Sequence, residues 1–193
     1  MREMQDGTKG IRAGIELMSN LKHVPNFFPT PKELVERMLA EADIELGVKV
    51  LEPSAGKGDI AIPIRDQMLE AGAFGANGEL QCVEINYTLA EHLTKQGLTV
   101  HRGDFLEYQK AGWDRIVMNP PFERGVDEKH IRHAYGLLAD GGRVVAIACS
   151  TTGRKLEHWV CEHGGYVEEL PAGTFARSDR PTNVNTCLTV LTK

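Results

Sequence analysis

The sequence contains no apolar stretch that approaches the roughly 18 residues of a membrane-spanning helix. Its first residues, Met1 to Asp6, are charged and lack the apolar core of a signal peptide. Internal repeats and low-complexity segments are also missing. These absences argue against a membrane-spanning or repeat protein, and they predict a cytoplasmic location.

Cysteine is scarce, with four residues in a chain of 193, and no two of them form a Cys-x-x-Cys pair. Their spacing therefore gives no support for a zinc site or a redox motif. Cys82, Cys149 and Cys187 lie in apolar, strand-like runs, where a free cysteine packs as a small hydrophobe. We predict no metal site.

Positive charge is not in excess, because 22 Lys and Arg stand against 27 Asp and Glu, which gives a net charge of −5. This balance argues against avid, non-specific binding to duplex nucleic acid, which depends on cationic contacts to phosphates. It leaves room for a local basic patch. Arg177 and Arg180 are the candidates for such a patch, and a solvated surface loop is the alternative.

The apolar content of 41% and the length of 193 residues predict one globular domain, residues 1–193, with a sizeable core. Strand and helix patterns alternate, which predicts an α/β fold with a mostly parallel sheet and helices on both faces. Seven strands are expected, at residues 48–52, 79–84, 98–101, 114–118, 143–149, 166–170 and 184–191. Since no helix separates the last two, we expect them to form an antiparallel hairpin in a Rossmann-like variant.

Helices are expected between most of these strands. Their predicted positions are residues 8–20, a helix capped by Thr30 with Pro31 at its first position, a helix ending near Gly72, then residues 88–96, 128–138 and 154–163. The glycines at 141 and 142 are expected to end the helix at 128–138. Residues 1–30 form an N-terminal helix and a connecting segment in this prediction.

The segment from Asn119 to Phe122, Asn-Pro-Pro-Phe, follows the apolar run at 114–118. Two prolines stiffen the backbone and remove two N–H donors, while their carbonyls still accept hydrogen bonds. Because an amide precedes them and an aromatic ring follows, the segment suits holding a flat group by its amino hydrogens. Asn-Pro and Pro-Pro are also ordinary turn signals, so a simple turn is the alternative.

The loop from Glu52 to Asp59, Glu-Pro-Ser-Ala-Gly-Lys-Gly-Asp, lies where the first strand turns into a helix. This first turn is where nucleotide-like ligands bind in such sheets, and glycine allows the backbone to approach a ligand. The loop matches neither Gly-x-Gly-x-x-Gly nor the Gly-Lys-Ser/Thr ending of a phosphate-binding loop. Its acidic residues disfavour a pyrophosphate, so a ligand with an ammonium or sulfonium group fits better.

Polar residues follow the next strands at the same edge of the predicted sheet. Glu84 ends the second strand, where a carboxylate binds ribose hydroxyls in dinucleotide folds. Asp104 and Phe105 follow the third strand, where they suit an exocyclic amino group and a purine face. Glu52, Glu84, Asp104 and Asn119 thus end four successive strands, at the edge where open α/β sheets bind ligands.

Taken together, these motifs resemble those of class I S-adenosylmethionine-dependent methyltransferases with an Asn/Asp-Pro-Pro-aromatic motif, and most closely those of DNA N6-adenine methyltransferases. The resemblance covers nearly the whole chain. The segment at 27–31, Phe-Phe-Pro-Thr-Pro, resembles the one that closes over the methionine part of the cofactor. The resemblance implies S-adenosylmethionine as cofactor. The residues it implies for cofactor binding are Phe28, Thr30, Glu52, Pro53, Ser54, Ala55, Gly56, Gly58, Asp59, Glu84, Ile85, Asp104, Phe105 and Asn119.

The resemblance also implies a reaction at Asn119, Pro120, Pro121 and Phe122. The Asn119 side-chain oxygen and the Pro120 carbonyl accept the two hydrogens of an exocyclic amino group, which frees the nitrogen lone pair to attack the cofactor methyl. Phe122 stacks on the target ring, and Phe175 is a second stacking candidate or else a core aromatic. Positioning and electrostatics supply most of the rate in such a mechanism.

One departure from the resembling enzymes limits the prediction of the substrate. Only short connections follow Phe122, which leaves little chain to read a DNA sequence in the grooves. Relaxed specificity, a specificity partner or homo-oligomer, or action on exposed bases are the options. DNA adenine is favoured as the target. The alternatives are an adenine or guanine amino group of ribosomal RNA, a protein glutamine, and a non-enzymatic role as a cofactor-binding subunit.

Overall fold

The computed structural model describes residues 28–72, 78–123, 125–176, 178 and 181–193. The helix predicted at residues 8–20, Phe27, Arg177 and Arg180 lie outside this part of the chain. Within it, no helix combines the length and the apolar character needed to cross a membrane.

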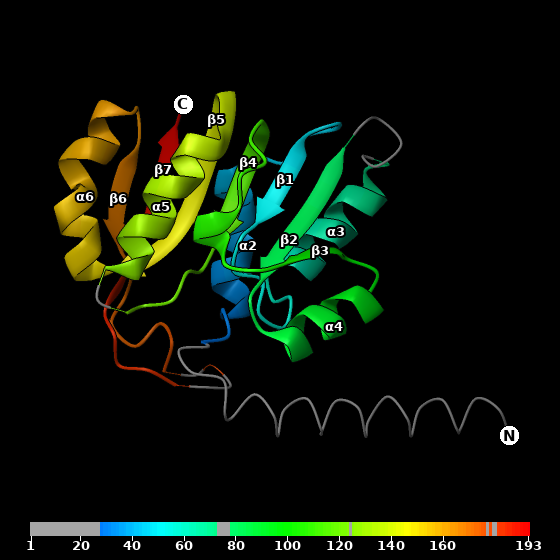
Figure 1. The fold of residues 1–193 in the computed structure, drawn as a ribbon. Coiled ribbons are helices and arrows are strands. Elements are labelled where there is room, and N and C mark those ends of the chain that lie inside the picture. The colour runs from blue at the N-terminus through cyan, green and yellow to red at the C-terminus, as the bar shows by residue number, and fades with distance from the viewer. Residues whose placement is uncertain (1–27, 73–77, 124, 177, 179–180) are drawn as a thin grey trace, which may run out of the picture.

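A seven-stranded sheet in the order β3-β2-β1-β4-β5-β7-β6 forms the framework (Figure 1). The strands are β1 (Lys49–Glu52), β2 (Glu79–Glu84), β3 (Thr99–Arg102), β4 (Trp113–Met118), β5 (Leu138–Cys149), β6 (Tyr166–Glu169) and β7 (Thr186–Thr192). Strands β3, β2, β1, β4 and β5 pair in parallel, whereas β7 is antiparallel to both β5 and β6. The predicted fold class, including the C-terminal hairpin, is confirmed.

Helices cover both faces of this sheet (Figure 1). They are α2 (Lys32–Ala42), α3 (Ala61–Glu70), α4 (Tyr87–Lys95), α5 (Val126–Leu137) and α6 (Ser150–Glu162), with a short 3₁₀ helix, η2 (Phe105–Glu107). α2 and α3 pack on one face, and α5 and α6 on the other. Each of these helices lies at or close to its predicted position.

Two predicted helix boundaries are wrong for identifiable reasons. Thr30 does not cap α2, because Pro31 occupies the N-cap and the Thr30 hydroxyl accepts a hydrogen bond from Asn119 instead. The glycines expected to end α5 belong to β5, because the Gly141 N–H donates to Lys193 and the Gly142 carbonyl accepts from it, at 2.8 and 2.9 Å. Contacts with residues distant in sequence decide both cases.

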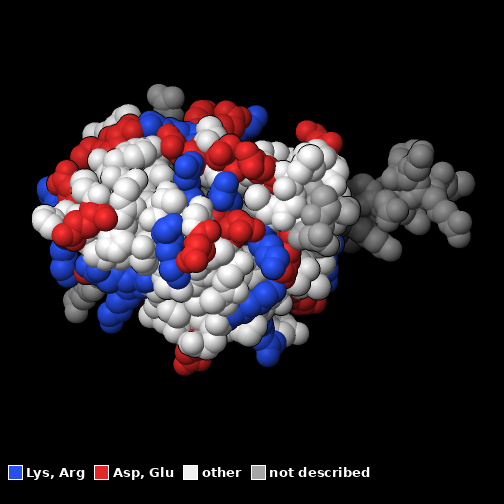
Figure 2. All heavy atoms as spheres, turned by 90° about the horizontal axis from the view of Figure 1, so that it is seen from above, with Lys and Arg blue, Asp and Glu red and all other residues white. Residues whose placement is uncertain are grey.

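Figure 2 views the molecule from above Figure 1, onto the edge of the sheet at which its parallel strands begin. Lys and Arg are interleaved with Asp and Glu on this face and do not gather into one basic area. This pattern agrees with the net charge of −5. The face seen there is therefore unsuited to binding a polyanion along its length.

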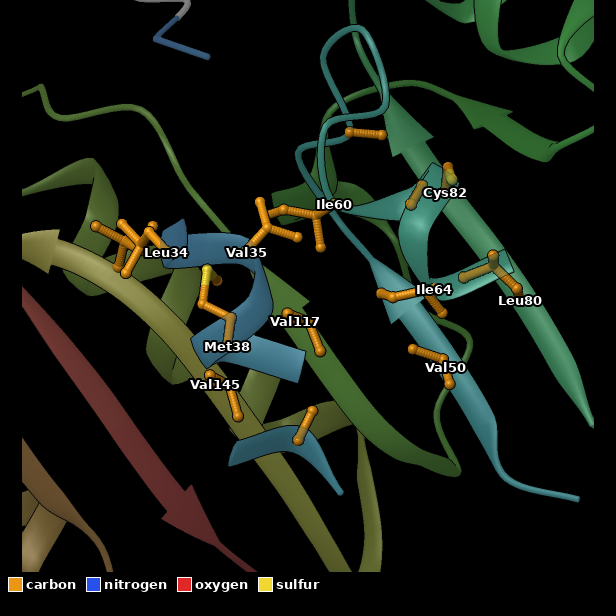
Figure 3. Packing of buried hydrophobic residues seen from close by; sticks show 14 of the residues in the cluster. Leu34, Val35, Met38, Val50, Ile60, Ile64, Leu80, Cys82, Val117 and Val145 are labelled. Atoms are coloured by element: carbon orange, nitrogen blue, oxygen red, sulfur yellow. The ribbon is translucent and has the colours of Figure 1, made fainter. Parts of the chain in front are cut away.

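The core forms two layers because neighbouring strand residues point to opposite faces. Val117 of β4 contributes to the layer beneath α2 and α3, while its neighbours Ile116 and Met118 contribute to the layer beneath α5 and α6. Figure 3 shows Leu34 and Met38 of α2 lying over the central strands. The polar loops at the carboxyl ends of the strands thus stand on a closely packed base.

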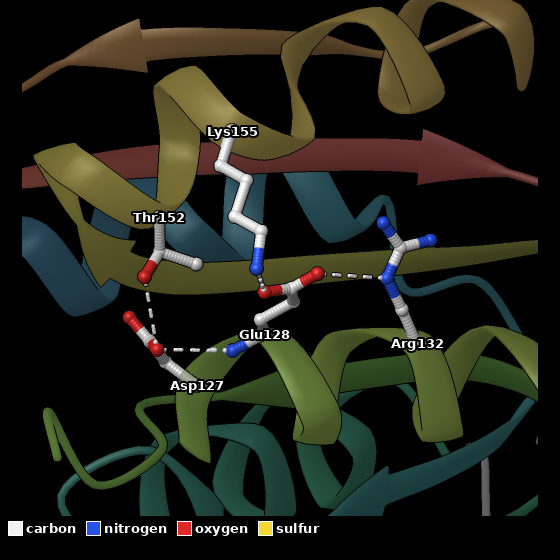
Figure 4. Close-up of polar contacts among 5 residues, drawn as sticks. All are labelled: Asp127, Glu128, Arg132, Thr152 and Lys155. Atoms are coloured by element: carbon white, nitrogen blue, oxygen red, sulfur yellow. Dashed lines mark hydrogen bonds and ion pairs between the residues drawn. The ribbon is translucent and has the colours of Figure 1, made fainter. Parts of the chain in front are cut away.

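Asp127, in the first turn of α5, connects that helix to the junction of β5 and α6 (Figure 4). Its buried carboxylate accepts hydrogen bonds from the Thr152 hydroxyl at 3.0 Å and from the Cys149 backbone N–H at 2.9 Å. Next to it, Glu128 forms ion pairs with Lys155 and Arg132. These contacts hold the far end of the loop that carries Asn119 to Phe122.

Candidate functional site

A cavity of about 540 Å³ lies at the carboxyl ends of β1, β2 and β4 and between the loops that follow them. All but one of the residues predicted to bind a cofactor line it: Phe28, Thr30, Glu52, Pro53, Ser54, Ala55, Gly56, Asp59, Glu84, Ile85, Asp104, Phe105 and Asn119. The exception is Gly58. The strand-end carboxylates that lie far apart in sequence therefore meet in one place.

Glu52 is the most deeply buried carboxyl group of the cavity, with 1% of its surface exposed. Its Oε2 has no hydrogen-bond partner among the described residues. Burial raises the pKa of Glu52 well above its usual value, and the nearby charges of Asp59 and Glu84 act in the same direction. A cation beside Oε2 would favour the ionised form of this carboxyl group, so the position suits a positively charged ligand.

Glu84 organises the loop after β1 from the end of β2. Its two carboxylate oxygens accept the backbone N–H groups of Gly56 at 2.8 Å and Asn86 at 2.7 Å. Burial raises the pKa of Glu84, and these backbone N–H groups oppose the rise. Glu84 therefore fixes the shape of the loop and also lines the cavity.

The two loop glycines have different roles. Gly56 lines the cavity, and its φ of 55° lies in the left-handed region that favours glycine. Gly58 has φ of 96°, and a Cβ there would lie 2.9 Å from Ile62 and 3.0 Å from Leu93. Its positive φ and its packing against α3 and α4 both favour glycine at Gly58. Gly58 does not line the cavity, and its contact with a cofactor stays a prediction.

Asp104 and Phe105 form the side of the cavity beyond β3. Asp104 caps η2 by accepting the Leu106 N–H at 2.9 Å. Phe105 is only 3% exposed, and its ring packs edge-on against His130 and His133 with centroid distances of 5.3 and 4.8 Å. Ile85, which is 69% exposed, offers the larger apolar surface to a flat ligand.

His130 also lines the cavity, and no sequence motif pointed to it. It is 6% exposed, and its Nδ1 has no partner in the part of the chain that the structure describes. Burial lowers the pKa of His130 to about 4, so the ring is neutral near pH 7. The other lining residues absent from the prediction are Val83, Asn86, Leu89, Gly103, Leu106, Glu123 and Val126. Several flank predicted residues, whereas His130 lies on a helix without a local motif.

Asn119 is oriented by two hydrogen bonds from its Nδ2, one to the backbone oxygen of Phe28 and one to the Thr30 hydroxyl, each 3.0 Å long. Because a carbonyl only accepts, the group facing Phe28 is the amide NH₂. The Asn119 Oδ1 is buried, and no described residue donates to it. The cavity therefore ends at a hydrogen-bond acceptor.

The rest of the Asn-Pro-Pro-Phe segment lies around this acceptor. Pro121 lines the cavity and Pro120 is buried. The Phe122 ring stacks on Phe28 with centroids 5.8 Å apart and meets Phe175 edge-on at 5.7 Å. Phe175 is 1% exposed and belongs to the main core, so it supports Phe122 and offers no free stacking face. Of the two roles considered for Phe175, the structure shows the core aromatic.

The cavity fits S-adenosylmethionine on the chemistry of its lining. The buried Glu52 Oε2, unpartnered among the described residues, suits the cationic end of that molecule. Glu84 suits the ribose hydroxyls, and Asp104 and Ile85 suit the amino group and the face of adenine. The volume of about 540 Å³ lies in the usual range of small-molecule sites. Among the described residues, no group of three or more His, Cys, Asp or Glu is arranged to hold a metal ion.

Several solved structures share this fold. A putative class I S-adenosylmethionine-dependent methyltransferase from Listeria monocytogenes matches with a TM-score of 0.70 and 16% identity, over 96% of this chain and 67% of that one. A modification subunit of a putative type I restriction enzyme from Vibrio vulnificus matches with a TM-score of 0.67 and 18% identity, over 99% of this chain and 49% of that one. TrmN from Thermus thermophilus matches with a TM-score of 0.59 and 21% identity, over 83% of this chain and 48% of that one.

The chain therefore spans about half the length of the Vibrio subunit and of TrmN. Other similar structures are named as RNA methyltransferases. Because the sequence identities are this low, the structural similarity shows a shared fold and does not show a shared activity. No curated protein matches the sequence.

Residues 32–166, which include β1 to β5 and the Asn119 loop, match the methyltransferase small domain family. This stretch is more than half of the chain. The chain belongs to the methyltransferase small domain family, and its cofactor is S-adenosylmethionine.

Proposed function

We propose that this protein transfers a methyl group from S-adenosylmethionine to the exocyclic amino group of adenine in nucleic acid, with DNA as the favoured substrate. The observation that carries the proposal is the orientation of Asn119. Its Nδ2 is held by Phe28 and Thr30, and its buried Oδ1 has no donor among the described residues. A neutral acceptor beside a cofactor cavity suits an incoming N–H group.

The reaction assigns distinct tasks to the residues of the site. S-adenosylmethionine, when bound, supplies an electrophilic methyl group on a positively charged sulfur. Asn119 Oδ1 and the Pro120 carbonyl accept hydrogen bonds from the two amino N–H groups, which makes the nitrogen lone pair available for the new N–C bond. The methylated nitrogen then loses one of its two protons to solvent. Pro120 and Pro121 keep these acceptors rigid. Catalysis then depends on positioning and on preorganised dipoles.

Nucleic acid is the proposed substrate class because it offers flat rings that carry amino groups. The Phe28-to-Pro31 segment and the likeness to a restriction-enzyme modification subunit support DNA. The short connections after Phe122 and the RNA methyltransferases with the same fold support RNA as the second candidate. In either case the base must leave its stack or be unpaired before it reaches Asn119.

The proposal includes the organisation of the chain. We propose that residues 1–193 act as one cytoplasmic methyltransferase domain, and that none of its internal connections forms a target-recognition module. Little chain is available between Phe122 and α5, or between β6 and β7, for reading a sequence. Target selection is then relaxed or is supplied by a partner or by a second copy of the chain.

The test incubates the purified chain with methyl-labelled S-adenosylmethionine and, separately, with duplex DNA, single-stranded DNA, RNA and protein, then digests each product. We expect the label on the N6 position of adenine. Asn119→Ala should lower kcat by about 100-fold or more, the usual cost of removing one preorganised hydrogen-bonding group. Gln67→Ala, which removes an exposed amide on α3, is the matched control.

The other outcomes separate the alternatives. Label on glutamine alone replaces nucleic acid with protein as the substrate. Full activity of Asn119→Ala on adenine contradicts the proposed role of the amide. Cofactor binding without transfer to any substrate indicates a non-enzymatic subunit.

A further inference from the structure

Phe122 has an aromatic neighbour on two sides. The Phe28 ring lies nearly parallel to it, with an interplanar angle of 17° and centroids 5.8 Å apart. The Phe175 ring meets it edge-on, at 86° and 5.7 Å. The apolar surface of Phe122 is therefore covered on these two sides by other rings of the chain.

The Phe28–Phe122 pair leaves no room for a third ring. Directly packed aromatic pairs have centroids about 4.5–7 Å apart, and 5.8 Å lies within that range. A flat ring between two parallel rings needs about 7 Å from plane to plane, since each contact takes about 3.5 Å. A target that stacks on the Phe28 side of Phe122 must displace one of the rings.

Of the two neighbours, Phe28 is the less deeply buried. Phe175 is 1% exposed and lies in the main core, where displacement would open a cavity. Phe28 is half-buried and packs at the border of that core. Its backbone is held by the hydrogen bond from Asn119, but its side chain can change rotamer without breaking that bond.

We propose that the Phe28 ring occupies the stacking position of the target ring and must rotate away before the target can lie against Phe122. The inference rests on the proposed function, because it requires a flat, amino-bearing target. Asn119 gives it a geometric basis, since the residue that offers Oδ1 to the target also holds the Phe28 backbone. Phe28 is thus a specificity-determining residue that selects targets able to replace a phenyl ring.

A series of Phe28 variants tests this at saturating cofactor, because Phe28 also lines the cofactor cavity. An aromatic stack accounts for about a two- to tenfold change in equilibrium. We expect Phe28→Leu, which keeps an apolar wall but cannot stack, to lower the KM for the nucleic-acid substrate by that factor. Phe28→Ala should lower it at least as much, and Phe28→Trp should raise it.

A binding measurement provides a readout independent of turnover. A single-stranded DNA oligonucleotide with one 2-aminopurine is titrated against each variant in the presence of S-adenosylhomocysteine, and base fluorescence reports stacking. The dissociation constants should follow the same order, Phe28→Leu tighter than the native chain and Phe28→Trp weaker. Melting temperatures show whether each variant is folded. If Phe28→Ala is not folded, Phe28→Leu alone provides the test.

An increase in KM and in the dissociation constant for Phe28→Leu overturns the proposal, because Phe28 is then part of the target's binding surface. Unchanged constants across the series overturn it as well, since the ring is then only a wall. If the native chain labels no nucleic acid, the proposed function fails separately. The series is then measured with the substrate that accepts the label.

Discussion

At the scale of single residues, the site depends on groups whose hydrogen-bonding capacity is left open. Glu52 and Asn119 each have a buried oxygen that no described residue satisfies. Buried polar atoms without partners are costly to a fold, so their position beside a cavity is informative. We propose that a bound ligand satisfies both oxygens, with a positive charge near Glu52 and an N–H group at Asn119.

Replacing Glu52 by Gln should weaken cofactor binding and stabilise the ligand-free fold. Loss of the charge removes about 10- to 100-fold in affinity, as for hydrogen bonds to charged groups. Because burial raises the pKa of Glu52, ionisation in the folded state is unfavourable. The neutral variant should therefore melt at a higher temperature near pH 7. Calorimetric titration and thermal melts measure the two effects, with the exposed Glu70→Gln as control.

The sign of the pH dependence follows from the same pKa. Because the pKa of Glu52 is higher in the folded state than in the unfolded state, its protonation stabilises the fold at pH values below the unfolded-state pKa. That stability is lost as the pH rises through the folded-state pKa. Acidification therefore stabilises the fold through Glu52, but it should lower cofactor affinity, because Glu52 takes up a proton and loses its negative charge. An affinity of the native chain that rises with acidity contradicts this role for Glu52.

At the scale of elements, the Asn119 loop is held at both ends. β4 fixes its beginning, and α5 fixes its end through Asp127. The Asp127 carboxylate satisfies donors of α6 and of the last residue of β5, so three elements meet at one side chain. Glu128 joins α5 to Lys155, but Lys155 and Arg132 are 69% and 43% exposed. Solvent screens those ion pairs.

We expect Asp127→Ala to lower the free energy of unfolding by about 2–3 kcal/mol, because it leaves the Thr152 hydroxyl and the Cys149 N–H without their acceptor. Glu128→Ala is the matched control and should cost less than about 1 kcal/mol, as exposed ion pairs do. Urea unfolding of both variants measures the difference. If both variants lose the same free energy of unfolding, the ion pairs of Glu128 stabilise the contact between α5 and α6 as much as the Asp127 hydrogen bonds do, and the prediction is wrong.

At the scale of the whole molecule, the cofactor and the fold are thermodynamically linked. The cavity is built from loops after β1, β2, β3 and β4 together with Phe28, Thr30 and α5. Binding therefore joins elements that are widely separated along the chain. A ligand that binds the folded state alone stabilises it by mass action.

Adding S-adenosylmethionine at about 100 times its dissociation constant should raise the free energy of unfolding by about 2.7 kcal/mol. For a chain of this length the melting temperature should rise by roughly 5–10 °C and increase with the logarithm of cofactor concentration. Scanning calorimetry should give one transition that shifts as a whole. A second transition insensitive to the cofactor contradicts the single-domain proposal.

The sequence by itself determined the order of strands and helices and the strand-end residues that line the cavity. It could do so because apolar runs and turn residues are local patterns, and because parallel strands place their carboxyl ends at one edge. Glu52 and Glu84 were identifiable on that basis without any knowledge of their neighbours.

Only the tertiary structure decided how the side chains of the site are used. Asn119 is oriented by Phe28 and Thr30, which lie 91 and 89 positions away in the chain. The burial of Phe175, the packing role of Gly58 and the presence of His130 likewise depend on elements that meet after folding. No local pattern encodes such contacts, because side-chain orientation is set by whichever residues the packed sheet and helices bring within reach.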